Sequence, residues 1–443
     1  MKKFLSAVVA IAVAATASAE GYQVNTLSAK QNGMGHTGTA LKLGSESMIF
    51  NPAGMAFMNN SFDLSGNFTA IFSSCTATYQ GKDYHTANDP STPMSFGAAF
   101  SIYKNLKAGV SFYTPYGSGI NWTENWPGST LNQSVKLAAY TVQPTVAWAI
   151  TPKLSIGAGL MVTWATVNLN KGLVSSTSMD ALLAAQGINY QFGDVTPASV
   201  NLTGKSQVTV GFNVGVFYEF NKQWSVGASF RSKQSLKVKA GTATVSYADN
   251  MAAAVLQEKI GVINQSNFAA EMPAPYVLSI GAAYKPTSRL TLAVDAQLTG
   301  WSAYKSLEIE FASAPTFNQS LTKDYHNSMT YRLGAQYGLT QRFDVRCGMM
   351  IDTTPVNKDY YNPETPGMTR IIPSIGFSFR PIKQVSIDLA GMYVAGLGAD
   401  NATGRYDDFI KKMKNPTGDS MTTFTADYTL HAFIPSIGIS YKF

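Results

Sequence analysis

The chain has little charge, little cysteine and little histidine for its length. Of its 443 residues, 13% are Asp, Glu, Lys or Arg, against about 25% in typical soluble domains. Two cysteines provide no disulfide framework, and the four histidines lack metal-ligand or nucleophile spacing. The net charge of +7 is spread along the chain, so nucleic-acid binding has little support. The composition is unusual for a soluble domain and predicts no catalytic residue, metal or cofactor.

Long apolar runs are also lacking. The chain starts MKKFLSAVVAIAVAATASAE, with two lysines, a short apolar stretch and the small residues Ala17-Ser18-Ala19. This pattern predicts a cleaved export signal over residues 1–19, because the run is shorter than the roughly 20 apolar residues of a spanning helix. No later window is long and apolar enough for such a helix. A charge-poor exported chain without spanning helices can satisfy its backbone in lipid only as a closed β-barrel.

The chain does have strong period-two alternation. In QVTVGFNVGVFYEF, residues 207–220, one face carries Val, Phe and Tyr, and the other carries mostly Gln, Thr, Gly, Asn and Glu. The first face suits lipid and the second suits a wet lumen. The last run, LHAFIPSIGISYKF, alternates in the same way and stops at Phe443. A soluble sandwich would seldom combine such a terminal aromatic strand with an export signal.

Short polar turns set the expected number of strands. They occur in IYKNLKAG, AITPKLSIG, EFNKQWSVG, YKPTSRLTL, GLTQRFDV and FRPIKQVSI. Bacterial barrels have short periplasmic turns and longer outer loops, so six such turns separate seven outer hairpins and predict fourteen antiparallel strands. The outer connections are expected to be polar surface loops. They fall at about 74–93, 115–134, 170–205, 244–275, 312–327, 353–370 and 398–423.

The segment before the first alternating run predicts a plug. Residues 20–60 are rich in Gly and small side chains and show no continuous strand pattern. Fourteen strands enclose more space than the side chains that fill an eight-stranded barrel, so this segment is expected inside the lumen. The predicted fold class is all-β, a 14-stranded antiparallel transmembrane β-barrel over residues 61–443 with an N-terminal hatch in its lumen.

Several of these stretches together resemble the FadL/TodX family of outer-membrane transporters. GYQVNTLSAKQNGMGHTGTA followed by FNPAGMA is similar to the family's hatch, and FYTPYGSGINWTENWPG, MPAPYVLSIGAAY, TGWSAYKSLEIEF and YRLGAQYG follow in the family's order. The resemblance covers nearly the whole mature chain and implies a Gram-negative outer-membrane location. It further implies passive uptake of hydrophobic molecules, above all long-chain fatty acids, by loop capture, lumenal binding, hatch movement and lateral release.

The resemblance also implies the position of a lateral exit. In the family, an Asn-Pro-Ala of the hatch meets a kink in the third strand at a gap in the wall. The residues here are compatible with it, since proline cannot donate to a ladder and glycine tolerates bulge geometry. A turn into the first strand is the other interpretation of NPAG. The exit candidates are Asn51, Pro52, Ala53, Gly54, Thr114, Pro115, Tyr116 and Gly117.

Two outer loops contain short helical patterns. SMDALLAAQG starts at a cap residue, Ser178, and ADNMAAAVLQEKIG starts at Asp249 or Asn250; each ends at a glycine. By the resemblance, these helices would form a first, weak substrate groove. Alternatively, they pack over the barrel mouth. The groove candidates are Leu182, Leu183, Met251, Val255, Leu256 and Ile260.

Four arginines are expected to face the lumen, because a charge that faces lipid near the midplane costs about 2–4 kcal/mol. A guanidinium group matches a carboxylate bidentately, which makes each arginine a candidate for binding a fatty acid. Pairing with an inward acid is the more ordinary role. The arginines are Arg231, Arg332, Arg346 and Arg380. The acids are Glu219, Asp295, Asp344 and Asp388.

Other classes of protein fit less well. A general diffusion porin would lack the Gly-rich plug, a surface adhesin would carry larger outer domains, and an outer-membrane enzyme would need clustered histidines. The expected partners are hydrophobic small molecules, outer-membrane lipid and lipopolysaccharide, and the expected state is a monomer. An oxidising compartment would permit a disulfide between Cys75 and Cys347, and the sequence leaves open whether they are bridged. The sequence leaves open which hydrophobic molecule is carried.

Overall fold

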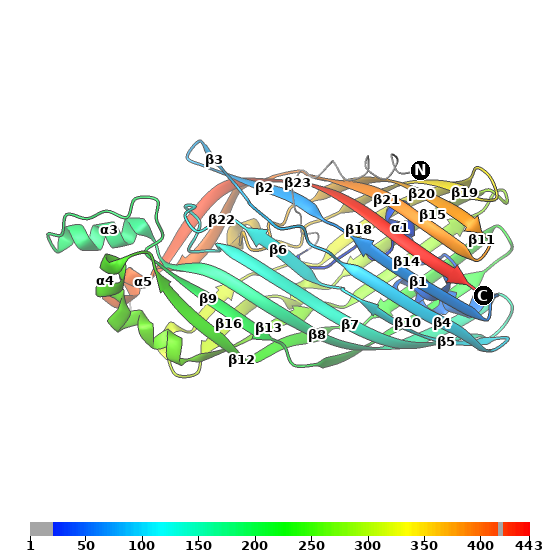
Figure 1. Ribbon diagram of the computed structural model, residues 1–443, viewed down its shortest axis with the longest axis horizontal. Helices are drawn as coiled ribbons and strands as arrows, with labels where there is room; N and C mark the ends of the chain where they lie inside the picture. Colours follow the sequence, from blue (N-terminus) through cyan, green and yellow to red (C-terminus); the bar gives the residue numbers. More distant parts are fainter. Residues whose placement is uncertain (1–20, 415–419) are drawn as a thin grey trace, which may run out of the picture.

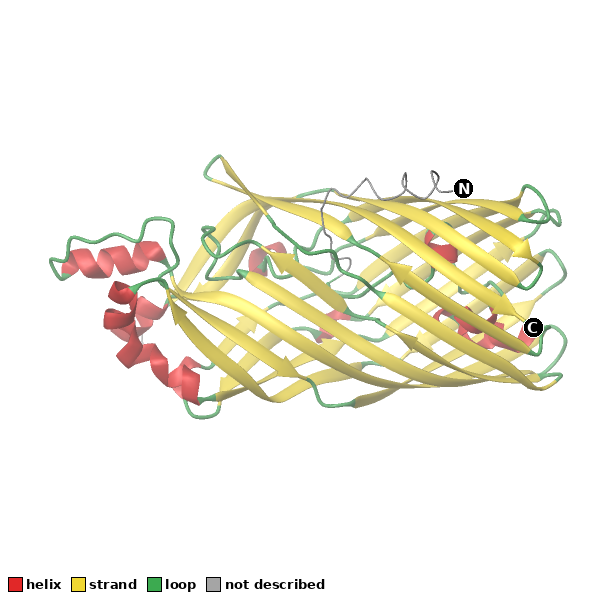
Figure 2. Ribbon diagram, viewed as in Figure 1, coloured by secondary structure: helices red, strands yellow, loops and turns green. Residues whose placement is uncertain are grey.

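The computed structural model describes residues 21–414 and 420–443, and a closed β-barrel dominates it (Figures 1 and 2). The expected export signal, residues 1–19, lies outside the described residues. Among the residues that are described, no helix is long and apolar enough to cross a membrane. Short helices lie inside the barrel and at one of its ends (Figure 2).

Fourteen strands of the described chain form the wall, each antiparallel to its neighbours. The ring closes because β1 (Phe62–Thr69) pairs with β4 on one side and with the last strand, β23 (Met421–Lys442), on the other. The predicted strand number is therefore confirmed. Between β1 and β23 the ring runs through β4 (Met94–Tyr103), β5 (Leu106–Tyr113), β7 (Ser134–Ala149), β8 (Leu154–Val174), β10 (Thr209–Glu219), β11 (Trp224–Arg231), β14 (Val277–Tyr284), β15 (Leu290–Thr299), β18 (Ser328–Gly338), β19 (Phe343–Asp352), β20 (Arg370–Ile382) and β21 (Val385–Gly396).

Alternation along the strands produces an apolar outer face and a polar inner face. In β10, Val210, Phe212 and Val214 are exposed on the outside, whereas Gly211 and Asn213 are buried inside. The six predicted turns join consecutive wall strands, and the end of the barrel that carries them is called the turn end. The opposite end, with the long connections, is called the loop end.

The wall extends further at the loop end than predicted. Strand β9, for example, pairs with both β8 and β12, although it lies in the span 170–205 that was expected to be a loop. The extra strands are rich in Ser, Thr and Asn, so their alternation has little apolar contrast. They are β2 (Phe72–Tyr79), β3 (Lys82–His85), β6 (Gly117–Asn121), β9 (Ala198–Lys205), β12 (Gln234–Tyr247), β13 (Asn267–Ala274), β16 (Ser306–Phe311), β17 (Gln319–Thr322) and β22 (Ala399–Asp407).

Helices cover the loop end. Helices α3, α4 and α5 project beyond the strands there (Figure 1). Their bounds are α3 (Ser176–Ala185), α4 (Asn250–Ile260) and α5 (Phe409–Lys414), and the 3₁₀ turns beside the upper strands are η3 (Gly261–Gln265), η4 (Trp301–Ala303) and η5 (Pro315–Phe317). The two cysteines are free thiols, Cys75 buried and Cys347 exposed.

The connection between β19 and β20 folds into the barrel. Residues 353–369, called the inner loop, were expected to be a surface loop, yet residues 361–368 are all buried. The loop contains η6 (Lys358–Tyr360). The indole N–H of Trp122 donates a 2.9 Å hydrogen bond to the carbonyl oxygen of Pro363. The prediction was wrong because the proline and glycine residues suggested a surface turn. The aromatic residues of the loop favour burial, but they do not indicate where in the barrel the loop would pack.

The hatch, residues 21–60, consists of short helices that depend on the wall. They are α1 (Ala29–Asn32), η1 (Gly44–Glu46), α2 (Ser47–Phe50) and η2 (Pro52–Phe57). Helices this short leave most of their backbone groups without internal partners. Wall side chains supply the partners: Asp295 accepts from the backbone N–H of Gly38 at 2.8 Å and of Thr39 at 3.0 Å, and Gln143 donates to Met48 at 2.7 Å.

Glycines on the inner face of the wall let the hatch backbone lie directly against the strands. A Cβ at Gly348 in β19 would come within 2.0 Å of the nitrogen of Gly35, and a Cβ at Gly157 in β8 within 2.5 Å of the carbonyl carbon of Pro52. Contacts this close leave no room for a side chain. The seat of the hatch therefore depends on these glycines.

We predict that Gly348→Ala displaces the hatch and raises the ionic conductance of the barrel in planar bilayers. Overpacking of this kind costs about 1–3 kcal/mol, and the hatch moves more readily than the hydrogen-bonded strands. Gly391→Ala in β21 is the matched control, because a Cβ there meets only Phe433, at 3.6 Å. Equal conductance of the two variants would contradict the prediction.

Candidate functional site

The wall is broken at its third strand. Strand β5 ends at Tyr113, and its continuation β6 begins at Gly117. Below the break, β5 pairs with both β4 and β7. Above it, β6 pairs with β7 and with no second strand among those described. Pro115 has no N–H to offer a neighbouring strand, which explains why the ladder stops here.

A cavity of about 310 Å³ lies at this break, and we call it the gap cavity. Its rims are residues 89–94, which precede and begin β4, and residues 114–119. Its lining includes Leu137, which faces the lumen, and Tyr140, which stacks on the outer face against Phe112. The gap cavity therefore passes through the wall, and its volume lies in the range of ligand pockets, about 300–1,000 Å³.

The inner side of the gap cavity is closed by Tyr22–Val24, called the N-terminal strip. The Val24 N–H donates to the Pro115 carbonyl at 2.9 Å, and the Gly117 N–H donates to the Tyr22 carbonyl at 2.8 Å. Between these two bonds, Gln23 and Tyr116 face each other as an antiparallel bridge. The strip thus supplies the edge that β6 otherwise lacks.

Aromatic contacts fix the start of the strip. The Tyr22 ring is fully buried, 4.7 Å from the Trp301 ring centre and 5.9 Å from the Tyr304 ring centre. Its hydroxyl donates to the carbonyl of Pro273. Burial raises the pKa of Tyr22 well above its ordinary value, with further contributions from Tyr325, Tyr116 and Glu364. The hydroxyl is therefore a hydrogen-bond donor at any physiological pH.

A second cavity, called the upper chamber, lies towards the loop end. Tyr22 lines the upper chamber, whereas Gln23 and Val24 line the gap cavity. The strip therefore lies between the two cavities, whose linings also share Ser118, Leu137 and Thr166. Only about 60 Å³ of the upper chamber is free, well below the volume of a ligand pocket. Its wall is almost wholly apolar and includes Val135, Leu137, Leu169, Leu202, Leu236, Val238, Phe268, Met272, Leu307 and Ile309.

The structure brings only one of the two predicted exit segments to the break. Thr114, Tyr116 and Gly117 line the gap cavity. The segment Asn51–Gly54 lies elsewhere, against β8, β10 and β11. Gly157, which touches Pro52, pairs with Ala147 on β7, whereas Gly117 at the break pairs with Ala138 on the same strand. Ala138 and Ala147 are roughly 30 Å apart along β7.

Asn51 explains this placement. Its side-chain amide donates to the carbonyl oxygens of Thr39, at 2.8 Å, and Val216, at 3.0 Å, and its side-chain oxygen caps η2 by accepting from the Ala53 N–H at 3.1 Å. Pro52 then fits beside the wall glycine Gly215. The NPAG motif fastens the hatch to the wall, and the prediction that it stands opposite the third-strand break was wrong in position.

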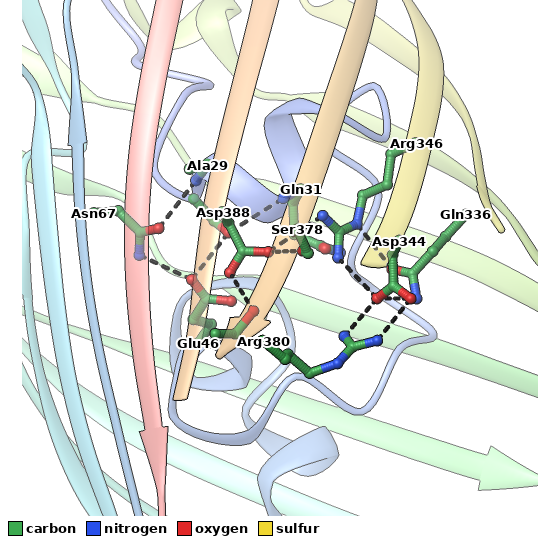
Figure 3. A network of polar contacts seen from close by, with 12 residues as sticks. Ala29, Gln31, Glu46, Asn67, Gln336, Asp344, Arg346, Ser378, Arg380 and Asp388 are labelled. Carbon is green, nitrogen blue, oxygen red and sulfur yellow. Dashed lines mark hydrogen bonds and ion pairs between the residues drawn. The ribbon is translucent and has the colours of Figure 1, made fainter. Parts of the chain in front are cut away.

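Two of the four arginines pair with wall acids (Figure 3). Arg346 lies 3.2 Å from Asp388, and Arg380 binds both oxygens of Asp344 at 2.6 and 2.8 Å. This is the ordinary role weighed from the sequence. Arg346 is fully buried, and its side chain also donates to Gln336 at 2.8 Å.

The hatch approaches this network through Glu46. Its carboxylate accepts from the Ser28 hydroxyl at 3.0 Å and from the Asn67 amide at 2.8 Å, and Asn67 accepts in turn from the Ala29 N–H at 3.0 Å (Figure 3). Burial raises the pKa of the Glu46 carboxyl, while the nearby Lys30 ammonium lowers it. The Glu46 side chain thus links the start of the hatch to β1.

Arg231 and Arg332 lie beside His36 in a small polar cavity of about 40 Å³. Arg231 donates to the carbonyl of Ile49 at 3.0 Å, and Arg332 donates to Gln297 at 3.0 Å. Burial lowers the pKa of His36 well below its ordinary value, and both guanidinium groups lower it further. The imidazole is therefore neutral. Neither arginine lines the upper chamber or the gap cavity.

Three other buried basic residues, all towards the loop end, escaped the sequence-based prediction. Arg370 lines the gap cavity, Lys171 donates to Gln319 at 3.0 Å, and Lys323 forms an ion pair with Glu364 of the inner loop. All three lie within segments that were expected to be exposed loops. These residues could have been identified only if the segments had been recognised as extensions of the wall or as a loop that folds inward.

The candidate groove residues belong to the core of the loop end. Leu183, Leu256 and Ile260 are fully buried, and Leu182, Met251 and Val255 are half-buried against the same cluster. This arrangement matches packing over the mouth, the alternative weighed from the sequence, while the half-buried side chains remain accessible from outside.

Of the two loop helices, α4 has a predicted N-cap residue and α3 does not. Helix α3 is capped by Ser175, which accepts from the Ser178 N–H at 3.2 Å, because the helix begins earlier than expected. Helix α4 is capped by Asp249, one of the two predicted residues, at 2.8 Å from the Ala252 N–H. A hydrogen bond from Tyr190, together with this cap, lowers the pKa of Asp249 below its ordinary value.

Comparisons with known proteins agree with this fold. A family model described as outer membrane protein transport protein (OMPP1/FadL/TodX) matches residues 10–443. The chain is 22% identical over 483 aligned residues to outer membrane protein P1 of Haemophilus influenzae, with 100% of each chain covered. The crystal structure of a Pseudomonas aeruginosa FadL homologue superposes with a TM-score of 0.77 at 18% identity, covering 96% of this chain and 100% of that one. The Pseudomonas putida toluene transporter TodX gives 0.68 at 16% identity, covering 96% and 99%. These two structural likenesses show the shared fold.

Proposed function

Because the chain belongs to the outer membrane protein transport family of OMPP1, FadL and TodX, we propose that it carries hydrophobic molecules from the cell surface into the outer membrane. The protein is an outer-membrane β-barrel of a Gram-negative bacterium. The proposed substrates are long-chain fatty acids, with aromatic hydrocarbons as the second class. The molecule is captured at the loop end, enters the upper chamber, displaces the N-terminal strip and leaves through the gap cavity.

One observation carries this proposal: the N-terminal strip lies between an apolar chamber and a cavity that passes through the wall. A route of this kind keeps an apolar chain out of water, which is worth about 0.8 kcal/mol for each methylene group. Lateral release into lipid is therefore more favourable than axial release into the periplasm. The hatch fills the turn end and so obstructs axial release, which also favours lateral release.

We further propose that the strip moves while the rest of the hatch stays seated. The strip is held by two backbone hydrogen bonds, by the ring and hydroxyl of Tyr22, and by a 3.3 Å hydrogen bond from the Thr299 hydroxyl to the Gln23 side chain. The remainder of the hatch is held by buried side chains such as Asp295, Gln143 and Asn51, and by close backbone packing on wall glycines. A segment with few bonds opens at lower free energy than one with many. In this scheme Asn51–Gly54 acts as a fixed anchor.

Uptake by living cells tests the proposal. Cells that express the protein should take up labelled oleate, or labelled toluene, severalfold faster at low external concentration than cells lacking the gene. The reason is that the saccharide layer of the outer membrane resists apolar solutes. A variant with a cross-linked strip, described below, is the matched control for expression and folding. Equal uptake with and without the gene for every hydrophobic probe would refute the proposal.

A further inference from the structure

The upper chamber contains one charged side chain. Among the residues that line it, Glu364 alone carries a charge, and the others are apolar or neutral. Glu364 comes from the inner loop rather than from the wall, and its carboxylate forms an ion pair with Lys323 of the connection that follows β17. The side chains are 10% and 1% exposed, respectively. An acidic residue whose carboxylate is paired with a buried ammonium thus borders an apolar chamber.

Burial makes this pair energetically demanding. Taking two charges out of water is costly, and the ammonium of Lys323 needs a compensating anion as long as it stays buried. The anion need not be Glu364 itself, because any carboxylate that reaches the ammonium provides the same compensation. Exchange of one carboxylate for another is therefore possible where simple removal of Glu364 is not.

The surroundings of Lys323 offer more hydrogen-bond donors than the pair uses. Its ammonium lies 5.9 Å from the Tyr304 ring centre, and Tyr304 packs on Tyr325 at 5.1 Å. The Tyr304 hydroxyl and the Trp301 indole N–H of this aromatic cluster are buried and have no hydrogen-bond partner among the described residues. A carboxylate has about four acceptor positions, so the cluster suits an anionic headgroup.

From these observations we propose that Glu364 occupies the place of the substrate's own carboxylate, and that a long-chain carboxylate displaces it from Lys323 as its chain fills the upper chamber. The inference rests on the proposed function and narrows its substrate class. The small free volume of the chamber agrees with it, because the inner loop must withdraw before a chain can fit. A neutral hydrocarbon offers no anion in exchange and leaves the pair closed.

The same displacement acts on the break in the wall. The Ser118 hydroxyl of β6 donates to the Glu364 carbonyl at 3.2 Å, and the Trp122 indole N–H donates to the Pro363 carbonyl at 2.9 Å. The inner loop therefore holds the upper half of the broken strand. When the loop withdraws, β6 and the residue that follows it lose these two bonds, and binding in the upper chamber is coupled to opening at the gap cavity.

Binding of oleate and oleyl alcohol to the purified protein in detergent tests the inference, because the two ligands share a chain and differ in charge. Glu364→Gln removes the internal competitor with little change of shape. We expect it to strengthen oleate binding about tenfold or more, the scale of one charge-assisted hydrogen bond, and to leave oleyl alcohol binding unchanged. Glu271→Gln is the matched control, since Glu271 pairs with Lys237 at an exposed site and does not line the chamber.

A second variant decides the matter if Glu364→Gln does not fold. Replacing both members of a buried pair by apolar residues usually preserves stability. Lys323→Met/Glu364→Met should therefore fold and lose any preference for oleate over oleyl alcohol. Three results would overturn the inference but leave the proposed function standing. The wild type binds oleyl alcohol while Glu364→Gln shows no increase in affinity for oleate, or Glu364→Gln shows the same increase in affinity for both ligands. The third is that the double variant keeps its preference for oleate. If the wild type binds neither of these ligands, nor toluene, the proposed function falls and the inference falls with it.

Discussion

Cross-linking the N-terminal strip to the broken strand should abolish uptake. The pair to join is Gln23 and Tyr116, which face each other across the bridge. The flanking residues make the two backbone bonds, Val24 to Pro115 and Tyr22 to Gly117, so this is a pair of the non-hydrogen-bonded type. Such pairs have Cα atoms about 4.5 Å apart, which is within the range that a disulfide spans.

In the Gln23→Cys/Tyr116→Cys variant, oxidation should reduce oleate uptake to the level of cells without the gene, and a reducing agent should restore it. The disulfide holds the strip against β6, and the upper chamber then has no outlet to the gap cavity. The measurement is labelled-oleate uptake before and after reduction, in a background in which Cys75 and Cys347 are replaced by Ser. One native thiol is buried and the other is exposed.

Two controls separate the lock from the loss of side chains. Tyr116→Cys alone removes the hydrogen bond from the Tyr116 hydroxyl to the Pro275 carbonyl, at 3.3 Å, and Gln23→Cys alone alters the lining of the gap cavity. Each single variant should transport equally well with and without the reductant. If the oxidised double variant keeps its uptake, the strip is not the moving part, and the route proposed above is wrong.

The barrel was predictable because its signals are local. The alternation of Val210, Phe212 and Val214 with Gly211 and Asn213 depends only on which side of a strand faces lipid. Each tight turn joins neighbours in sequence, so counting turns gives the strand number without knowledge of any distant contact. The inward direction of the arginines follows from the same parity.

The site was less predictable because its contacts are distant in sequence. Asn51 of the hatch finds its partner Val216 in the wall, 165 positions away in sequence, and nothing near either residue encodes that pairing. The strip at Gln23 meets Tyr116 in the same way. The burial of Glu364 depends on the whole inner loop folding inward, although its Pro- and Gly-containing sequence looks like an exposed turn. Local patterns specify the wall, while long-range packing decides what fills it.

Removal of Arg346 should give the second large effect, on the seat of the hatch. Its fully buried side chain lies between Asp388, at 3.2 Å, and Asp344, at 3.7 Å. Breaking a buried ion pair by removing one partner costs about 3–5 kcal/mol, because the remaining charge is left uncompensated. In Arg346→Met, strands β19 and β20 keep their backbone hydrogen bonds. The loss of stability should therefore affect mainly the adjoining part of the hatch, where Gly33 packs against Gly376.

The measurements are thermal unfolding followed by circular dichroism and conductance in planar bilayers. Arg346→Met should unfold at a lower temperature and conduct more than the wild type. The double variant Arg346→Met/Asp388→Leu should recover much of the lost stability, since it removes the stranded carboxylate as well. Lys305→Met is the matched control, because it breaks an exposed pair with Asp324 worth at most about 1 kcal/mol. Two results would contradict the prediction: Arg346→Met loses no more thermal stability than Lys305→Met, or the double variant is less stable than Arg346→Met. In either case the buried network does not hold the hatch, and the glycine contacts alone must seat it.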